Sequence, residues 1–206
     1  MPLRIRHWTP HYLFRRALLQ AYQLRNPEAP WLTARAIEIL RTALRRSDRG
    51  LEWGSGRSTL WLAERTAALV SVESSAEWFE QISKLARHRA VANLDYRYVA
   101  ENERRGERHA YVDVAGELPD ESLDYVLIDG LFRAECAAAG ARLVKPGGIL
   151  ILDDAERYLP LAPHLPEGRR TPAEPDWQEF ATLVTNWRLI WTSDGISATA
   201  LWIRAQ

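Results

Sequence analysis

A short glycine-rich stretch, Glu52-x-Gly54-x-Gly56, carries the residue types and the spacing best suited to binding a ligand in this chain. It follows the apolar Leu51 and precedes a run of helical character, a pattern typical of a strand, a tight turn and a helix start. The glycines permit positive φ angles and a close approach to the backbone, and the free N–H groups of the helix start favour electron-rich ligand groups. Glu52 favours a ligand with an ammonium group and ribose hydroxyls over a pyrophosphate.

Two features separate this stretch from better known phosphate-binding loops. Thr59 stands where the dinucleotide fingerprint has its third glycine, and no Gly-Lys-Ser/Thr follows to form a phosphate loop. Alone, the motif is also consistent with an ordinary tight turn.

Carboxylates follow four predicted strands, at Glu52, Glu73, Asp129 and Asp153. Because the carboxyl ends of parallel strands share one edge of a sheet, these acids are expected together at the edge where α/β sheets bind ligands. Glu73 comes at the tip of the second strand, where βαβ nucleotide-binding units hold ribose hydroxyls. Ser74 and Glu77 fit a capping box for the next helix, which leaves Glu73 for a ligand.

Strand and helix patterns alternate along the chain, with a final pair of strands around Ser193-Asp194-Gly195 that indicates a hairpin. The expected fold is α/β: a Rossmann-like, mostly parallel sheet of seven strands, helices on both faces, a C-terminal antiparallel hairpin and extra N-terminal helices. Predicted helices begin at Pro10 and Thr33 and cover 58–68, 134–143 and 176–184; predicted strands cover 69–72, 96–100, 123–128, 149–152, 187–192 and 198–204, and 101–109 is expected to be a solvated loop.

The length of 206 residues suits a single domain, 1–206, with an N-terminal helical cap over 1–48 and an α/β core over 49–206. Two additions to the core could cover a ligand: the cap and the proline-rich segment 154–175, which is long for a connection. Aromatic residues of the cap are candidates for a pocket lining: His7, Trp8, His11 and Tyr12.

Composition excludes several classes of partner. The formal net charge is zero, so nothing favours nucleic acid, and no apolar run reaches the ~20 residues of a membrane span. Cys136 is the single cysteine, which suits a reducing cytoplasm. The arginine-rich start could also indicate an organellar transit peptide, but it lacks serine. The sequence is compatible with a homo-oligomer.

Taken in order, these motifs resemble the class I S-adenosylmethionine-dependent methyltransferases over residues 50–204: the glycine loop, Glu73, the strand ending at Asp129, Lys145-Pro146-Gly147-Gly148 and the terminal hairpin. The resemblance implies S-adenosylmethionine as cofactor. It places the glycine loop at the methionine part, Glu73 at the ribose, and Glu52 and Asp129 near the ammonium group. The cofactor-binding residues it implies are Glu52, Gly54, Ser55, Gly56, Ser58, Thr59, Glu73, Ser74, Asp129 and Gly130, with Glu101, Asn102 or Tyr111 as candidates at the adenine.

The acceptor is expected to be a small molecule methylated on oxygen. The chain has no Asn/Asp-Pro-Pro-Tyr/Phe motif of amino-methylating nucleic-acid enzymes, and no catalytic cysteine of the kind that serves to methylate carbon-5 of pyrimidines is recognised in it. In direct displacement the protein aligns a nucleophile and removes its proton, and Asp129 and Asp153 are the predicted catalytic residues, with Asp154 and His164 as further candidate bases.

A metal-assisted variant stays open. Asp129 and Asp153-Asp154 match positions at which catechol-type O-methyltransferases hold Mg²⁺, whose oxygen ligands would lower the pKa of a hydroxyl. Against it, Gly130-Leu131-Phe132-Arg133 does not match that family, and Asp129 could simply border the cofactor. Two other functions also remain: a non-catalytic protein that binds S-adenosylmethionine or a nucleotide, and a nicotinamide-dependent oxidoreductase.

Overall fold

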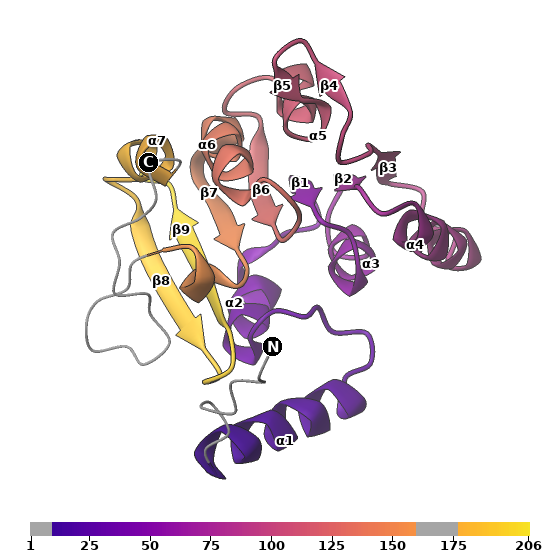
Figure 1. Cartoon of the computed structure of the whole chain (residues 1–206), viewed down its shortest axis with the longest axis vertical. Coiled ribbons are helices and arrows are strands. Elements are labelled where there is room, and N and C mark those ends of the chain that lie inside the picture. Colours follow the sequence, from indigo (N-terminus) through magenta and orange to yellow (C-terminus); the bar gives the residue numbers. More distant parts are fainter. Residues whose placement is uncertain (1–9, 160–176) are drawn as a thin grey trace, which may run out of the picture.

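A mixed sheet of seven strands forms the middle layer of the protein, in the order β3-β2-β1-β6-β7-β9-β8 (Figure 1). The computed structural model describes residues 10–159 and 177–206, without the side chains of 11 and 12. The pairs β1–β2, β2–β3, β1–β6 and β6–β7 are parallel, and β9 runs antiparallel to β7 and β8. The strands are β1 (Arg49–Trp53), β2 (Ala68–Glu73), β3 (Leu94–Tyr98), β6 (Leu123–Ile128), β7 (Val144–Leu152), β8 (Arg188–Ser193) and β9 (Ala198–Ile203). The predicted fold class is confirmed.

Helices cover both faces of this sheet. On one face α2 and α3 pack against the sheet, and on the other face α5, η2, α6 and α7 do so. A small separate hairpin, β4–β5, precedes α5. The bounds are α1 (Pro10–Arg25), α2 (Ala34–Ala43), α3 (Arg57–Ala63), α4 (Ala76–His88), β4 (Arg104–Arg105), β5 (Arg108–His109), α5 (Ala110–Asp113), η2 (Val114–Glu117), α6 (Arg133–Leu143), η3 (Ala155–Arg157) and α7 (Gln178–Leu183).

The sequence of the central strands explains their place. β6 reads Leu-Asp-Tyr-Val-Leu-Ile and its last four residues are buried, as expected for a parallel strand covered on both faces. α6 is rich in alanine and lies close to this sheet: a Cβ at Gly140 would lie 2.9 Å from Val126 and 3.3 Å from Trp53. Small residues therefore let α6 approach the sheet at its middle.

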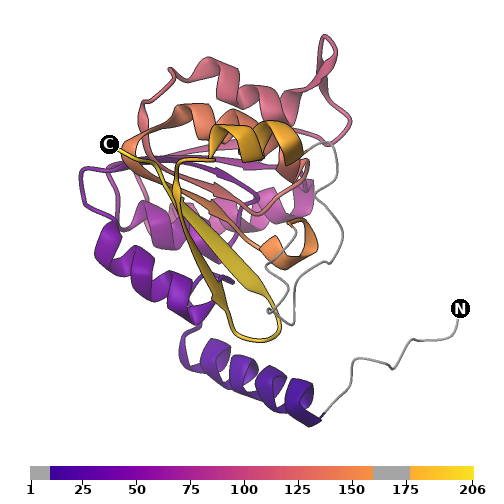
Figure 2. The same ribbon diagram turned by 90° about the vertical axis from the view of Figure 1, so that its left-hand side faces the viewer.

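The two N-terminal helices have different surroundings. Ile37 and Leu40 of α2 are buried in the core cluster of one sheet face, so α2 belongs to a helical layer. α1 lies outside the layers (Figure 2), and it meets the rest of the protein partly at the β8–β9 turn, where a Cβ at Gly195 would lie 3.6 Å from Arg15 Cδ. Among the described helices, none combines the length and the apolar character needed to cross a membrane.

Several predicted boundaries were wrong. The helix after the glycine loop ends at Ala63 and not at 68, because Asn93 binds the carbonyls of Ala63 and Thr66 and turns the chain toward β2. The cap of α4 is Ser75, whose hydroxyl accepts from Trp78 N, and not Ser74. The expected loop 101–109 contains the β4–β5 hairpin.

Candidate functional site

The glycine loop and the end of β6 touch through their backbones at the carboxyl edge of the sheet. Gly54 has φ 90°, and a Cβ there would lie 2.5 Å from Gly130 N. A Cβ at Gly130 would lie 2.0 Å from the Tyr111 hydroxyl and 2.8 Å from Gly54 N. Since no larger residue fits at either position without a backbone shift, Gly54 and Gly130 fix the floor of the site.

Glu73 ends β2 beside this loop, with its side chain saturated by protein donors. Its Oε2 accepts from Ser55 N at 3.0 Å and from Ser55 Oγ at 2.6 Å. Its Oε1 accepts from Ser74 N at 2.8 Å and from Ser75 N at 2.7 Å. A carboxylate offers about four acceptor positions, so a ligand hydroxyl would have to displace one of these donors to reach Glu73. The Ser55 hydroxyl is the easiest to displace, because it also lies 2.6 Å from the Tyr96 hydroxyl and can rotate to it.

Aromatic residues hold the glycine loop from outside. Trp78 Nε1 donates to Ser55 O at 2.6 Å, and the Trp78 ring stacks on Trp31, which precedes α2, at 6.2 Å. The Arg57 guanidinium lies 5.3 Å from the Trp31 ring. The segment before α2 therefore reaches the loop, a contact that no pattern in the sequence predicts.

Glu52 lies beneath the loop, fully buried. Its Oε2 accepts from Thr59 Oγ1 and Ser71 Oγ, both at 2.6 Å, while Thr59 Oγ1 accepts from Gly56 N at 2.9 Å. Burial raises the pKa of Glu52 to about 7, although hydrogen bonds from Ser58, Ser71 and Thr59 oppose the rise. Oε1 has no partner among the described residues. Thr59, in place of a third glycine, thus ties the loop to Glu52.

Asp129 follows β6 and forms an ion pair with Arg133 in the first turn of α6. Arg133 Nη2 lies 2.8 Å from Asp129 Oδ1, and the side chains are 10% and 30% exposed, respectively. Burial raises the pKa of Asp129 to about 6, and the Arg133 charge opposes that rise. The described residues donate no hydrogen bond to Oδ2 of Asp129, so this oxygen is available to a ligand.

Asp153, at the end of β7, lies deeper. It is 5% exposed, and its Oδ1 accepts from Thr199 Oγ1 at 2.8 Å. Burial and the neighbouring Asp129 charge raise the pKa of Asp153 well above its ordinary range. Thr33 N donates to the same Thr199 hydroxyl at 3.1 Å. The N-cap of α2 is thereby connected to the acidic end of the site.

A cavity of about 580 Å³ opens beside the site, between the ends of β2 and β3 and the start of α6. Two of the three residues proposed to contact adenine, Glu101 and Asn102, line it together with Ser74 and Phe132. Tyr111, the third, is fully buried and does not line it, because its ring fills the space under Gly130. His109 also lines the cavity, and its ring stacks on that of Phe132 with the centroids 3.6 Å apart.

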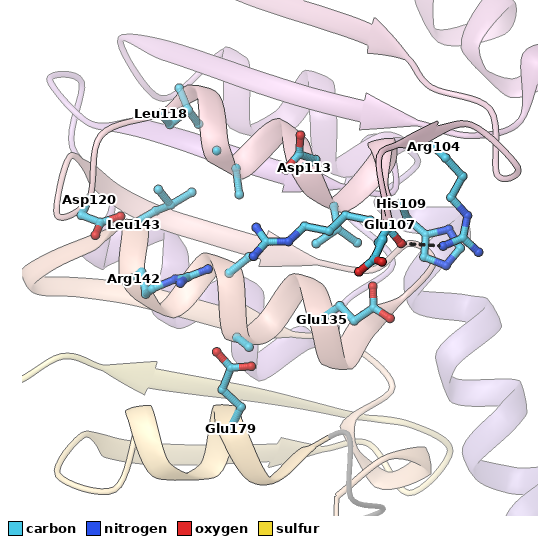
Figure 3. A pocket seen from close by; sticks show the side chains of 16 residues that line it. Arg104, Glu107, His109, Asp113, Leu118, Asp120, Glu135, Arg142, Leu143 and Glu179 are labelled. Atoms are coloured by element: carbon cyan, nitrogen blue, oxygen red, sulfur yellow. Dashed lines mark hydrogen bonds between the residues drawn. The ribbon is translucent and has the colours of Figure 1, made fainter.

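A second cavity, of about 560 Å³, lies between the β4–β5 hairpin, α5 with η2, and α6. Figure 3 shows side chains of both signs around it, among them Arg104, Arg142, Glu135 and Glu179. None of the predicted site residues lines this groove.

The acids at the strand ends do not fit Mg²⁺ as they stand. Within residues 10–159 and 177–206 no three His, Cys, Asp or Glu side chains are arranged to hold a metal ion. Asp129 Oδ1 is bound by Arg133 and Asp153 Oδ1 by Thr199, so two of the oxygens that a metal would need already accept protein donors.

Some predicted residues lie outside the part of the chain that the structure describes. These are His7, Trp8 and His164, with most of the segment 154–175, and the side chains of His11 and Tyr12. Conversely, the sequence did not predict three residues that the structure places at the site: Tyr96, Trp78 and Arg133. Only Arg133 carried a sequence signal, since it follows Asp129 by four residues.

Neither a protein-family model nor a curated protein sequence matches this chain. Solved structures do match. A methyltransferase from Geobacter sulfurreducens has a TM-score of 0.58 at 13% identity, over 93% of this chain and 89% of that one. Together with the strand order and the glycine loop, that match decides the fold. The chain has the class I S-adenosylmethionine-dependent methyltransferase fold.

Two further structures agree with this methyltransferase fold. An rRNA methylase from Streptococcus thermophilus has a TM-score of 0.54 at 10% identity, with coverages of 82% and 93%. A methyltransferase-like protein from Silicibacter pomeroyi has a TM-score of 0.53 at 22% identity, with coverages of 86% and 89%. At these identities the likeness concerns the fold.

Proposed function

We propose that the protein is an S-adenosylmethionine-dependent methyltransferase that methylates an oxygen atom of a small-molecule acceptor. The observation that carries the proposal is the meeting of the glycine loop, Glu73 and a cavity of about 580 Å³ at the carboxyl edge of a methyltransferase-type sheet. The glycine loop lets a ligand approach the backbone closely, Glu73 can accept hydrogen bonds from hydroxyls, and the cavity has room for a flat base. They follow one another in the order of the methionine part, the ribose and the adenine of the cofactor.

The cofactor would lie along this edge. Its adenine would occupy the cavity beside Phe132, between Ser74 and Asn102. Its ribose hydroxyls would donate to Glu73 after the Ser55 hydroxyl turns to Tyr96. The methionine part would lie over the stretch from Gly54 to Gly56 and beside Gly130, with Ser58 and Thr59 supporting the loop from below.

Glu52 would act on the methionine ammonium group through the loop rather than by direct contact, because the carboxylate is fully buried. Asp129 is the acid at this edge with an oxygen open to a ligand, since Arg133 occupies Oδ1 alone. The cofactor and the acceptor can therefore lie together beside Gly130, within reach of Asp129 as the base.

The chemistry is a single displacement. When bound, S-adenosylmethionine would supply an electrophilic methyl group: Asp129 Oδ2 would take the proton of the acceptor hydroxyl, the acceptor oxygen would form its bond to the methyl carbon, and the electrons of the carbon–sulfur bond would return to sulfur. The products are the methylated acceptor and S-adenosylhomocysteine. A pKa of about 6 for Asp129, raised by burial, leaves the carboxylate mainly ionised at neutral pH and therefore able to act as a base. Asp153 is buried, so it would influence the charge of Asp129 and not contact the acceptor.

The remaining properties support a small acceptor in the cytoplasm. The formal net charge is zero, which gives no electrostatic attraction for nucleic acid. Cys136 is buried and unpaired, in keeping with a reducing compartment.

Calorimetry with S-adenosylhomocysteine, followed by transfer of a labelled methyl group to a panel of phenols, hydroxy acids and amines, tests the proposal. We expect binding and labelling of a hydroxyl compound. Binding without transfer to any compound would indicate a non-catalytic cofactor-binding protein, and absence of binding would refute the proposal altogether.

A further inference from the structure

Arg133 is the most enclosed cation among the acids at the ends of β6 and β7. Its side chain is only 10% exposed, although arginine is rarely buried without a defined set of partners. It lies within 4.0 Å of carboxylate oxygens of both Asp129 and Asp154, and its guanidinium lies 5.1 Å from the Tyr158 ring.

The guanidinium binds oxygens from both strand ends. Nη2 donates to the carbonyl and to the Oδ1 of Asp129, both at 2.8 Å. Nε donates to Gly130 O at 3.0 Å, and Nη1 donates to Asp153 O. Four hydrogen bonds thus join residues 129–130, after β6, to residue 153, after β7.

This set of partners is what a bound cation would have. Carbonyl and carboxylate oxygens from two loops surround one positive charge, as they do around a hard metal ion. The planar guanidinium is permanently charged and its donors point in fixed directions, so it holds Asp129 Oδ1 in one place. The other carboxylate oxygen, Oδ2, is left toward the ligand edge.

We infer that Arg133 is the resident cation of this site: it positions the Asp129 carboxylate and keeps divalent cations out of the cluster of oxygens that it binds, on Asp129, Gly130 and Asp153. Where it concerns Asp129 as the base, the inference rests on the proposed function; the exclusion of cations does not. Arg133 is a positioning residue, because it acts through Asp129 and not on the acceptor itself.

Three variants separate this role from a merely structural one. Arg133→Gln removes the charge and keeps a hydrogen-bonding side chain. Arg133→Lys keeps the charge but loses the planar arrangement of donors. Arg157→Gln is the matched control, because Arg157 pairs with Asp154 at 3.0 Å from an exposed position, with its side chain 62% accessible, and has no hydrogen bond to Asp129.

The first readout is Mn²⁺ binding, followed by the electron paramagnetic resonance signal of the free ion. We expect no binding at this cluster in the wild type, Arg133→Lys and Arg157→Gln, and a new site in Arg133→Gln. A wild-type site that disappears in Asp129→Asn would overturn the inference, and so would an Arg133→Gln protein that folds but binds no Mn²⁺. If Arg133→Gln does not fold, Arg133→Met, which also removes the charge, takes its place, and a folded Arg133→Met protein that binds no Mn²⁺ overturns the inference in the same way.

The second readout is the separation of kcat from KM once an acceptor is known. We expect kcat to fall by about tenfold to a hundredfold in Arg133→Gln, with the acceptor KM little changed and partial recovery in Arg133→Lys, because a small displacement of the base affects mainly the chemical step. An Arg133→Gln kcat equal to that of Arg157→Gln would contradict the positioning role. Failure of the wild type to bind S-adenosylhomocysteine would refute the proposed function, and the Mn²⁺ result would still decide the inference.

Discussion

The backbone N–H and the hydroxyl of Ser55 both donate to one oxygen of Glu73, at 3.0 and 2.6 Å. The first bond ties the glycine loop to the end of β2 through the backbone, and the second can be exchanged for a bond to the Tyr96 hydroxyl, 2.6 Å away. In the proposed function, the Ser55 hydroxyl therefore holds the place of a ribose hydroxyl on Glu73. This relationship gives Ser55 and Glu73 different expected effects on cofactor binding.

We expect Glu73→Gln to weaken S-adenosylhomocysteine binding by about 1.5–3 kcal/mol, the usual contribution of a hydrogen bond to a charged group. Ser55→Ala is the matched control, since it removes only the competing hydroxyl and should leave the affinity unchanged or higher. Titration calorimetry of both variants provides the comparison. Equal weakening by the two substitutions would show that Ser55, and not Glu73 alone, contacts the cofactor.

Gly54→Ala should strongly destabilise the fold. The positive φ of 90° would strain alanine, and the new Cβ would lie 2.5 Å from Gly130 N. We expect a loss of about 1–2 kcal/mol for the backbone conformation and a further ~1–3 kcal/mol for overpacking. Gly106→Ala is the control, because Gly106 also has a positive φ, 63°, but nothing within 4 Å. Urea unfolding should therefore show only the smaller loss for Gly106→Ala, and similar losses would mean that the loop can move away from Gly130.

Glu52 should make the stability depend on pH. Burial raises the pKa of Glu52 from its ordinary 4.5 to about 7, so the folded state holds an extra proton between these values and stability falls as pH rises through that window. Glu52→Gln removes this dependence. The free energy of unfolding of the variant, minus that of the wild type, should therefore increase by about 3 kcal/mol from pH 4 to pH 8. Unfolding free energies of both proteins at the two pH values measure the difference, and other buried acids cancel in the comparison. A difference that does not change with pH would place the ionisation of Glu52 in its ordinary range.

The proline-rich segment after β7 is expected to determine the acceptor. Its two ends meet in the structure, since the rings of Tyr158 and Trp177 lie 5.8 Å apart, so a short linker can close the gap. Replacing residues 161–172 by glycine and serine should preserve folding and S-adenosylhomocysteine affinity but abolish turnover, because the acceptor must approach the ends of β6 and β7. Thermal denaturation and calorimetry are the controls. Turnover at the wild-type rate would move the specificity element elsewhere.

The sequence alone determined the fold class and the edge at which the site lies. Continuous apolar runs such as 149–152 specify buried parallel strands, and strands of one direction bring their final acids to one edge. Glu52, Glu73, Asp129 and Asp153 were therefore placed there by local pattern. The hairpin around Gly195 was equally local.

The tertiary structure decided what each acid does. Acidic residues lie at or next to the ends of four strands, yet Glu52 and Asp153 are buried, Glu73 accepts from four protein donors, and Asp129 Oδ2 has no donor among the described residues. These differences arise from partners distant in sequence, such as Thr199 for Asp153 and Ser55 for Glu73. Hydrogen bonding and desolvation depend on which side chains the fold brings together, and no period or spacing in the chain encodes those contacts. For the same reason, only the tertiary structure showed that Arg133 binds Asp129 Oδ1, an oxygen that a metal ion at this edge would need.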